Sequence, residues 1–325
     1  MKALTGAMGV LFLAVAGLAS AQTPSKTVDD YLGEAKVAAG MNWAGTFLRL
    51  CVPPPGGQPG RRSGGPRATP AREVWYAEPA KVADNLYFLG TKSHNSWAIV
   101  GSEGIIVIEA LFDYATRDEI VDGLKKVGLD SANIKYVILS HGHGDHDGGA
   151  KFLQDEIKGV HLIYGAEDWD LVESQTDRPG GVPKRDKVGD DGMVVSVGDA
   201  SVRIVTMPSH TAGTLSYLFE VRDNGKPLRV AYVGGTAIPF NGTAEYYDGY
   251  IASSKKVGDA AAAYGATVLL SNHTEFDNAY WKAHLAASRH PGEPNPFDVG
   301  EGGVAGYFTV VQACVAAAKL RATGQ

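Results

Sequence analysis

The sequence predicts an α/β protein built as a sandwich of layers. Short apolar segments of strand length recur in both halves of the chain, and segments of helical periodicity lie between them. A third observation is a histidine-rich loop at 141–146, which directly follows one of the apolar segments. The chain has 325 residues, enough for one large domain or two.

The N-terminus has the features of a secretory signal. Lys2 precedes an apolar stretch from Val10 to Leu18, and small residues follow at Ala19-Ser20-Ala21. We expect cleavage after Ala21 and export to the periplasm or the exterior. The apolar stretch is too short for a stable membrane span, so we expect none in the mature protein.

The net charge argues against a nucleic-acid partner. The formal charge is −6, and removal of Lys2 with the signal makes it −7. Nucleic-acid-binding proteins carry basic patches that neutralise phosphates. We therefore expect no nucleic-acid partner.

The chain divides into three predicted parts. Residues 1–21 are the signal, and residues 22–74 form an N-terminal segment with a helix at Val28 to Ala39 and a Pro/Gly/Arg-rich linker. Residues 75–325 form the main domain. Cys51 and Cys314 lie in different parts, and an oxidising compartment would permit them to pair. Two buried free thiols are an equal alternative.

In the first half of this domain, the sequence pattern predicts strands followed by helices. Strands are expected at 86–89, 97–100, 105–108, 136–139 and 160–164. Helices are expected at 116–127, 150–157 and 167–172. The charged segment 175–191 is interpreted as a solvated loop, with a mobile flap as the alternative.

The second half repeats the pattern. Strands are expected at 202–206, 215–221, 228–233 and 268–270. Helices are expected at 247–264, 279–288 and 308–321.

The loop after the apolar segment Tyr136 to Leu139 indicates a metal site. It reads His141-Gly-His143-Gly-Asp145-His146, with three imidazoles and a carboxylate in six residues. These ligand types suit zinc, with iron or manganese as alternatives. So many ionisable groups packed together would repel on protonation and need a metal to justify them.

Two further histidines occupy similar positions at predicted strand ends. His210 follows the strand at 202–206, and His273 follows the strand at 268–270. Each alone would be an ordinary loop residue. Beside the first cluster, they become candidate ligands.

At this point the chain resembles the metallo-β-lactamase superfamily from about Trp75 to Leu320. The His-x-His-x-Asp-His motif and the later strand-end histidines match in order. Subclass B3 β-lactamases look most similar, because His273 opens Asn272-His273-Thr274 and Asn295-Pro296-Phe297-Asp298 follows. The resemblance implies a four-layer αβ/βα sandwich.

The resemblance also implies two zinc ions and their ligands. His141, His143 and His210 would hold the first metal, and Asp145, His146 and His273 the second. A metal-bound hydroxide would then open a cyclic amide, with Asp145 orienting it as the catalytic carboxylate.

Two departures from the family bear on the substrate. Many members have a metal-bridging aspartate in the segment matched by Tyr232 to Thr236, where Gly235 stands here. Its absence disfavours the glyoxalase, ribonuclease and phosphodiesterase-like branches. B3 enzymes commonly place serines in this segment to hold the substrate carboxylate, but here Gly235 and Ala237 stand there, with Thr236 as a substitute.

These features lead to three hypotheses. The first is a secreted dizinc hydrolase with β-lactams as the first substrate class. The second is the same chemistry on lactones, carboxylic esters or sulfate esters, and the third is a mononuclear iron oxidoreductase on the same fold. Outside the motif, His94 is expected in a surface or turn role, Trp43, Trp75 and Trp97 in the core, and Tyr246-Tyr247 near the pocket.

Overall fold

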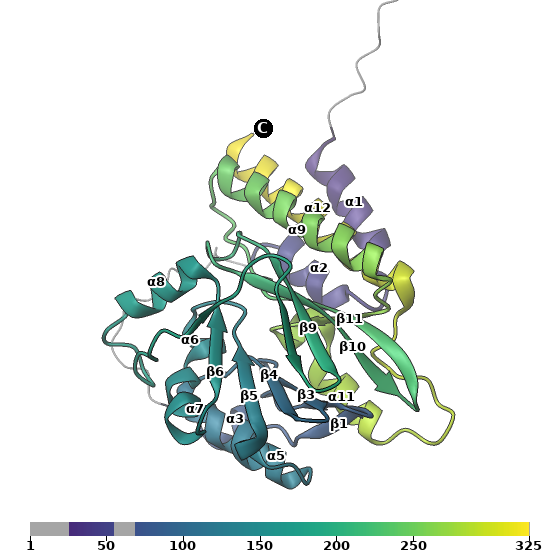
Figure 1. Cartoon of the computed structure of the whole chain (residues 1–325). Helices are drawn as coiled ribbons and strands as arrows, with labels where there is room; N and C mark the ends of the chain where they lie inside the picture. The colour runs from purple at the N-terminus through teal and green to yellow at the C-terminus, as the bar shows by residue number, and fades with distance from the viewer. Residues whose placement is uncertain (1–25, 55–68, 325) are drawn as a thin grey trace, which may run out of the picture.

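The computed structural model describes residues 26–54 and 69–324, and the predicted signal segment lies outside them. Two sheets pack face to face, with helices on both outer sides (Figure 1). This is the predicted four-layer sandwich. The sheets carry twelve strands within the described residues.

The first sheet follows the chain order from β1 to β7. Its first four strands are antiparallel, and β4 to β7 are parallel. Their bounds are β1 Ala80–Ala83, β2 Leu86–Phe88, β3 Trp97–Gly101, β4 Gly104–Ile108, β5 Ile134–Ile138, β6 His161–Tyr164 and β7 Lys187–Val188.

The second sheet has the order β12-β11-β10-β9-β8. Only β11 and β12 are parallel. The bounds are β8 Val194–Val197, β9 Ala200–Thr206, β10 Leu215–Asp223, β11 Lys226–Val233 and β12 Val268–Ser271.

Successive side chains along a strand point to opposite faces of its sheet, and the two faces pack into different cores. Ile106 of β4 and Phe219 of β10 point between the sheets, whereas their neighbours Val107 and Leu218 point outward. Successive strand residues face opposite sides, so each sheet contributes to two cores. The inner core joins the sheets, and each outer core joins one sheet to its helices.

The helices that cover the first sheet come from the first half of the chain. Their side chains, including Ile120, Leu124 and Trp169, pack on the outward face of that sheet. The bounds are α3 Arg72–Trp75, α4 Asp113–Thr116, the π-helix η1 Arg117–Val121, α5 Asp122–Lys126, the 3₁₀-helix η2 Ser131–Asn133, α6 Gly144–Asp147, α7 Ala150–Glu156 and α8 Ala166–Ser174.

The second sheet is covered by helices from both chain ends. In Figure 1, α1, α9 and α12 lie together on its outer side, and α12 contacts α1, α2 and α9. The bounds are α1 Val28–Ala39, α2 Ala44–Cys51, α9 Ala244–Tyr264, α10 Thr274–Asp277 and α12 Gly300–Thr323. Helix α11, Ala279–Ala287, instead packs against β1 and contributes to the inner core. The predicted helix at 28–39 is therefore confirmed.

Helix α12 is apolar and long enough to cross a membrane. Its apolar side chains instead pack inside the protein, where Val311 and Val315 meet residues of α9 and the second sheet. A buried core helix meets the same compositional criteria as a spanning helix. The structure thus accounts for this hydropathy by core packing.

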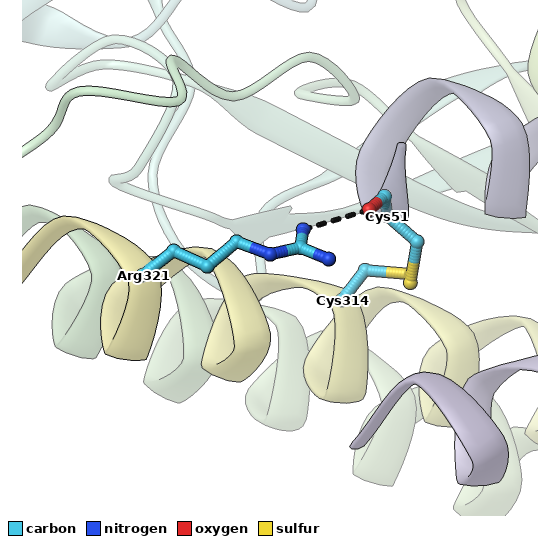
Figure 2. Close-up of a disulfide and its surroundings, with 3 residues drawn as sticks. All are labelled: Cys51, Cys314 and Arg321. Carbon is cyan, nitrogen blue, oxygen red and sulfur yellow. Dashed lines mark hydrogen bonds between the residues drawn. A yellow bond between two sulfur atoms is a disulfide. The ribbon is translucent and has the colours of Figure 1, made fainter. Parts of the chain in front are cut away.

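Cys51 and Cys314 form a disulfide that ties α2 to α12 (Figure 2). Both side chains are buried. The Arg321 guanidinium donates to the Cys51 carbonyl at 2.8 Å and strengthens the same junction. Of the two alternatives for the cysteines, the structure shows the disulfide.

Candidate metal centre

The six predicted ligands meet at one edge of the sandwich, where several strands end. The loop with His141, His143, Asp145 and His146 follows β5, and the other two histidines follow β9 and β12. Strand ends of both sheets open onto this edge. Segments far apart in the sequence therefore contribute to one site.

The first group consists of His141, His143 and His210, with ligand atoms within 4.8 Å of one another. His143 Nδ1 lies 3.1 Å from His210 Nε2. In a tetrahedral zinc site with bonds of about 2.0–2.1 Å, neighbouring nitrogens lie about 3.3 Å apart. The spacing therefore suits a shared metal.

In two histidines of this group, the ring nitrogen that faces away from the cluster contacts another protein group. His210 Nδ1 lies 2.8 Å from the Ala237 carbonyl, and His141 Nδ1 lies 2.9 Å from the Ser140 hydroxyl. His141 Nε2 is buried and has no hydrogen-bond partner among the described residues. An orphaned ring nitrogen aimed into a cluster, with its opposite nitrogen fixed, is typical of a metal ligand.

The second group surrounds the Asp145 carboxylate. Oδ2 of Asp145 lies 3.3 Å from His146 Nε2 and 3.8 Å from His273 Nε2. The two histidine nitrogens lie 3.1 Å apart. These three donors again have the spacing of ligands to one metal.

The electrostatics favour the ligating protonation states of His141, His273 and Asp145, but not of His146. Burial opposes protonation of His146, yet the neighbouring Asp145 carboxylate raises its pKa above the ordinary value. Burial lowers the pKa of His141 and of His273 well below the ordinary value, and neighbouring imidazoles add to this effect. Burial opposes ionisation of Asp145, but His146 holds the pKa of this carboxyl well below its usual range. Neutral imidazoles and an ionised carboxylate are the forms that bind metals.

Two buried carboxylates hold the loops together. Asp168 of α8 accepts from the Gly142 amide at 2.8 Å and from the Thr211 hydroxyl at 2.7 Å, which joins the loops of the first group. Asp277 accepts from the Ser271 amide at 2.7 Å and from the Asn95 side chain at 3.2 Å. Sequence reasoning missed both, because nothing local distinguishes them from surface acids.

The structure also brings His94 to the second group, although a surface or turn role was expected. Its Nε2 lies 3.4 Å from Asp145 Oδ2, and its ring centroid lies 4.8 Å from that of His273. An isolated antiparallel bridge pairs these two histidines. The only sequence signal was its position after a strand.

The glycines at 234 and 235 leave no space for a bridging aspartate. A β-carbon at Gly235 would lie 2.8 Å from His210 Cβ, and one at Gly234 would lie 1.8 Å from the Leu215 carbonyl oxygen. Both distances are shorter than the van der Waals contact between the two atoms allows. The steric surroundings thus explain why neither position carries a side chain.

Thr236 is not free to hold a substrate carboxylate. Its side chain is buried, and its hydroxyl donates to Asn272 Oδ1 at 2.8 Å. Tyr247 is also buried, with its hydroxyl on the Pro239 carbonyl, so it belongs to the core rather than to a pocket. Trp43, Trp75 and Trp97 lie in the core, as expected.

A cavity of about 480 Å³ opens beside the metal loop. Gly144 and Phe112 line its inner side, and residues 174–179 line the other. The loop that bears these residues is anchored, because the Arg178 guanidinium forms a buried ion pair with Asp147. It is therefore more firmly held than a solvated loop.

Comparison with known proteins agrees with this geometry. Residues 89–224 match the metallo-beta-lactamase superfamily. The chain is 29% identical over 182 residues to a Beta-lactamase-like protein 2 homolog of Caenorhabditis elegans, covering 55% of this chain and 52% of that protein. The alignment thus spans about half the length of that relative.

Two other relatives are named as hydrolases of different substrates. A hydroxyacylglutathione hydrolase of Synechococcus is 25% identical over 202 residues, covering 59% of this chain and 75% of the relative. The N-acyl homoserine lactonase AttM of Agrobacterium fabrum is 29% identical over 119 residues, covering 33% and 44%.

Solved structures confirm the fold. BJP-1, a subclass B3 metallo-beta-lactamase of Bradyrhizobium japonicum, superposes with a TM-score of 0.64 at 28% identity, covering 74% of this chain and 93% of that one. A mutant of the metallo-beta-lactamase FEZ-1 from Legionella gormanii gives 0.66 at 21% identity, covering 81% and 100%. These comparisons show that the chain shares the fold of the two metallo-beta-lactamases and is similar in sequence to a metallo-beta-lactamase superfamily model.

Proposed function

The chain contains a metallo-β-lactamase superfamily domain, and from that premise we propose that it is an exported dinuclear zinc hydrolase that opens a cyclic amide, with β-lactams as its first candidate substrates. The observation that carries this proposal is the pairing of two donor groups at one edge of the sandwich. His141, His143 and His210 would hold one zinc, and Asp145, His146 and His273 the other.

When bound, zinc supplies a nucleophile by lowering the pKa of water towards neutrality, and it polarises a carbonyl oxygen as a Lewis acid. The chain's own contribution is to place and orient the reactants. An ionised Asp145 accepts a hydrogen bond from the attacking water and so aligns it. The buried carboxylates of Asp168 and Asp277 keep the loops fixed, which avoids reorganisation during the reaction.

The cavity beside Gly144 is the proposed substrate site. Its volume of about 480 Å³ lies within the range of small-molecule pockets. It contacts the metal loop directly, and the aromatic ring of Phe112 provides an apolar surface. Gly144 is the point where this cavity meets the metal loop, and none of the six proposed ligands lines it, so a substrate bound here has to extend past Gly144 to reach the metals.

Lactones are the second candidate substrate class, because this cavity has poor features for binding a carboxylate. Asp113 and Asp177 are acidic residues in its lining, and the Arg178 charge is already paired with Asp147. The hydroxyl of Thr236, the one substitute for the missing serines, already donates to Asn272. A neutral lactone or ester would avoid the repulsion that an anionic β-lactam meets here.

Export is supported by the disulfide between Cys51 and Cys314. Disulfides form and persist in oxidising compartments and are rare in the cytosol. The signal features at residues 1–21 predict the same destination.

The test is turnover of a chromogenic cephalosporin by the zinc-loaded protein, alongside a lactone, a carboxylic ester and a sulfate ester. Chelator-sensitive opening of the cephalosporin is the expected result. Opening of the lactone alone would transfer the assignment to the second candidate. Iron in the purified protein, together with oxygen consumption, would contradict hydrolysis and favour the oxidoreductase.

A further inference from the structure

His94 contributes a seventh potential ligand to the metal centre. Its Nε2 lies 3.4 Å from Asp145 Oδ2, while His146 Nε2 and His273 Nε2 lie 3.3 and 3.8 Å from the same oxygen. The ligand atoms of His94, Asp145 and His273 all lie within 4.8 Å of one another. His94 thus approaches Asp145 as closely as the two family-matched histidines do.

The backbone holds His94 at this place. The Asn95 amide donates to the Asn272 carbonyl at 2.9 Å, and the Thr274 amide donates to the Ser93 carbonyl at 3.1 Å. These bonds flank the bridge between His94 and His273. The segments 93–95 and 272–274 are thus hydrogen-bonded on both sides of the two histidines, and this pairing holds His94 beside His273.

A buried side-chain bond reinforces the same junction. The Asn95 amide group donates to the Ser271 carbonyl at 2.8 Å, and Asn95 is fully buried. On the other side of His94, the Thr91 hydroxyl accepts from the His94 amide at 2.9 Å. The turn that carries His94 is thus fixed from within the protein.

The ring orientation follows the pattern of the other ligands. His94 Nδ1 lies 3.0 Å from the Ser93 hydroxyl, and Phe112 contacts the ring edge-on with centroids 4.9 Å apart. This arrangement leaves Nε2 facing Asp145. The same division, one nitrogen fixed and the other facing the cluster, occurs at His141 and His210.

A simple hydrogen bond to Asp145 explains this arrangement less well. The separation of 3.4 Å exceeds the usual 2.7–3.2 Å of an N–H···O bond, and it is close to the spacing of about 3.3 Å between donors on one zinc. Only 16% of the His94 side chain is exposed.

We propose that His94 is a fourth protein ligand of the second metal position, together with Asp145, His146 and His273; this rests on the two-metal site of the proposed function. Four protein donors are typical of closed, tightly held zinc sites, and three donors leave an open position. The second metal therefore binds more tightly than the first. The position held by His141, His143 and His210 is the one open to substrate.

The first experiment measures zinc affinity by competition with a coloured chelator in the wild type, His94→Ala and His284→Ala. His284 is an exposed histidine on α11 and serves as the matched control. Loss of a partner outside the ligand shell weakens metal affinity by about 10–100-fold, so loss of a ligand should cost about 100-fold or more at one position. Unchanged binding of both zincs by His94→Ala would overturn the proposal.

A second measurement separates ligation from positioning and is made on the wild-type protein, with a variant used only to assign signals. ¹⁵N NMR of histidine-labelled wild-type protein follows ring nitrogens during zinc addition, and the His94 signals are assigned by their absence in His94→Gln. We expect His94 Nε2 to shift with the same zinc equivalent as His146 and His273. A His94 Nε2 that keeps the shift of an unligated ring would contradict ligation.

Neither measurement needs a substrate, so the ligand assignment of His94 and the proposed hydrolytic function can be refuted independently of each other. Absence of hydrolysis with His94 bound to zinc would refute the function and leave the ligand assignment. Binding of a single zinc, or an unligated His94, would overturn the ligand assignment while hydrolysis could persist.

Discussion

The Tyr232 hydroxyl of β11 donates to Glu109 Oε1 at 2.6 Å and so connects the two sheets beneath the metal loop. The other carboxylate oxygen of Glu109 lies 4.0 Å from His146 Nδ1. Burial raises the pKa of Glu109 to about 7. His146 Nδ1 has no hydrogen-bond partner among the described residues, so Glu109 acts on this ligand through its charge and packing and not through a hydrogen bond.

Tyr232→Phe should weaken zinc binding at the second position by about 10-fold, because Glu109 loses the donor that fixes it near His146. Tyr217→Phe is the matched control. The Tyr217 ring lies 5.4 Å from that of Tyr232, but its buried hydroxyl has no hydrogen-bond partner among the described residues. Equal zinc affinities in the two variants would count against this role of Glu109.

His143→Ala and Asp145→Asn should each reduce turnover on the order of 100-fold or more, since each removes a ligand from one of the two groups. Steady-state rates on the best substrate of the panel check this. His161→Ala removes a partly exposed histidine that pairs with Asp186, and this variant should keep its rate. Near-normal turnover of either metal-loaded ligand variant would refute the site.

Much of the fold was accessible from local pattern. The short apolar runs of β3 and β4 and the helical composition of α1 are local features, and the prediction located all three elements. The start of α12 was missed because Gly302, Gly303 and Gly306 disfavour helix in isolation. Packing explains one of these glycines: a β-carbon at Gly306 would lie 3.0 Å from the Ala38 carbonyl oxygen of α1.

The residues of the site also divide into those that a local pattern reveals and those that only the fold brings into place. The cluster from His141 to His146 is contiguous and could be recognised from its composition, and His210 and His273 follow apolar strands. His94 acquires its place only through the bridge to His273. Its neighbours are polar residues typical of turns, so no local pattern could distinguish it.

Glu119 should make the stability of the protein depend on pH. Burial raises its pKa from 4.5 to about 9, so the folded state favours the protonated carboxyl. Its stabilising contribution is complete below about pH 4.5 and is lost as the pH rises through about 9. Glu119→Gln should therefore have the higher unfolding midpoint at pH 9, with little difference at pH 5.

Thermal unfolding of both proteins from pH 5 to pH 9 checks this prediction. The glutamine keeps an acceptor for the Ala77 amide, which now donates to Glu119 Oε1 at 2.9 Å. Parallel pH profiles for the two proteins would contradict a buried, protonated Glu119.

Replacement of both Cys51 and Cys314 by serine should lower the free energy of unfolding by about 2–5 kcal/mol, because the disulfide closes a long loop between α2 and α12. Denaturant titration of the variant and of the oxidised wild type measures the loss. Identical midpoints would show that helix packing alone holds the junction.

The central claim is a centre for two zinc ions, and metal content tests it most directly. Protein loaded with zinc and dialysed against metal-free buffer should retain two zinc ions per chain, and His210→Ala should retain one. A single zinc in the wild type, or iron in its place, would contradict the account.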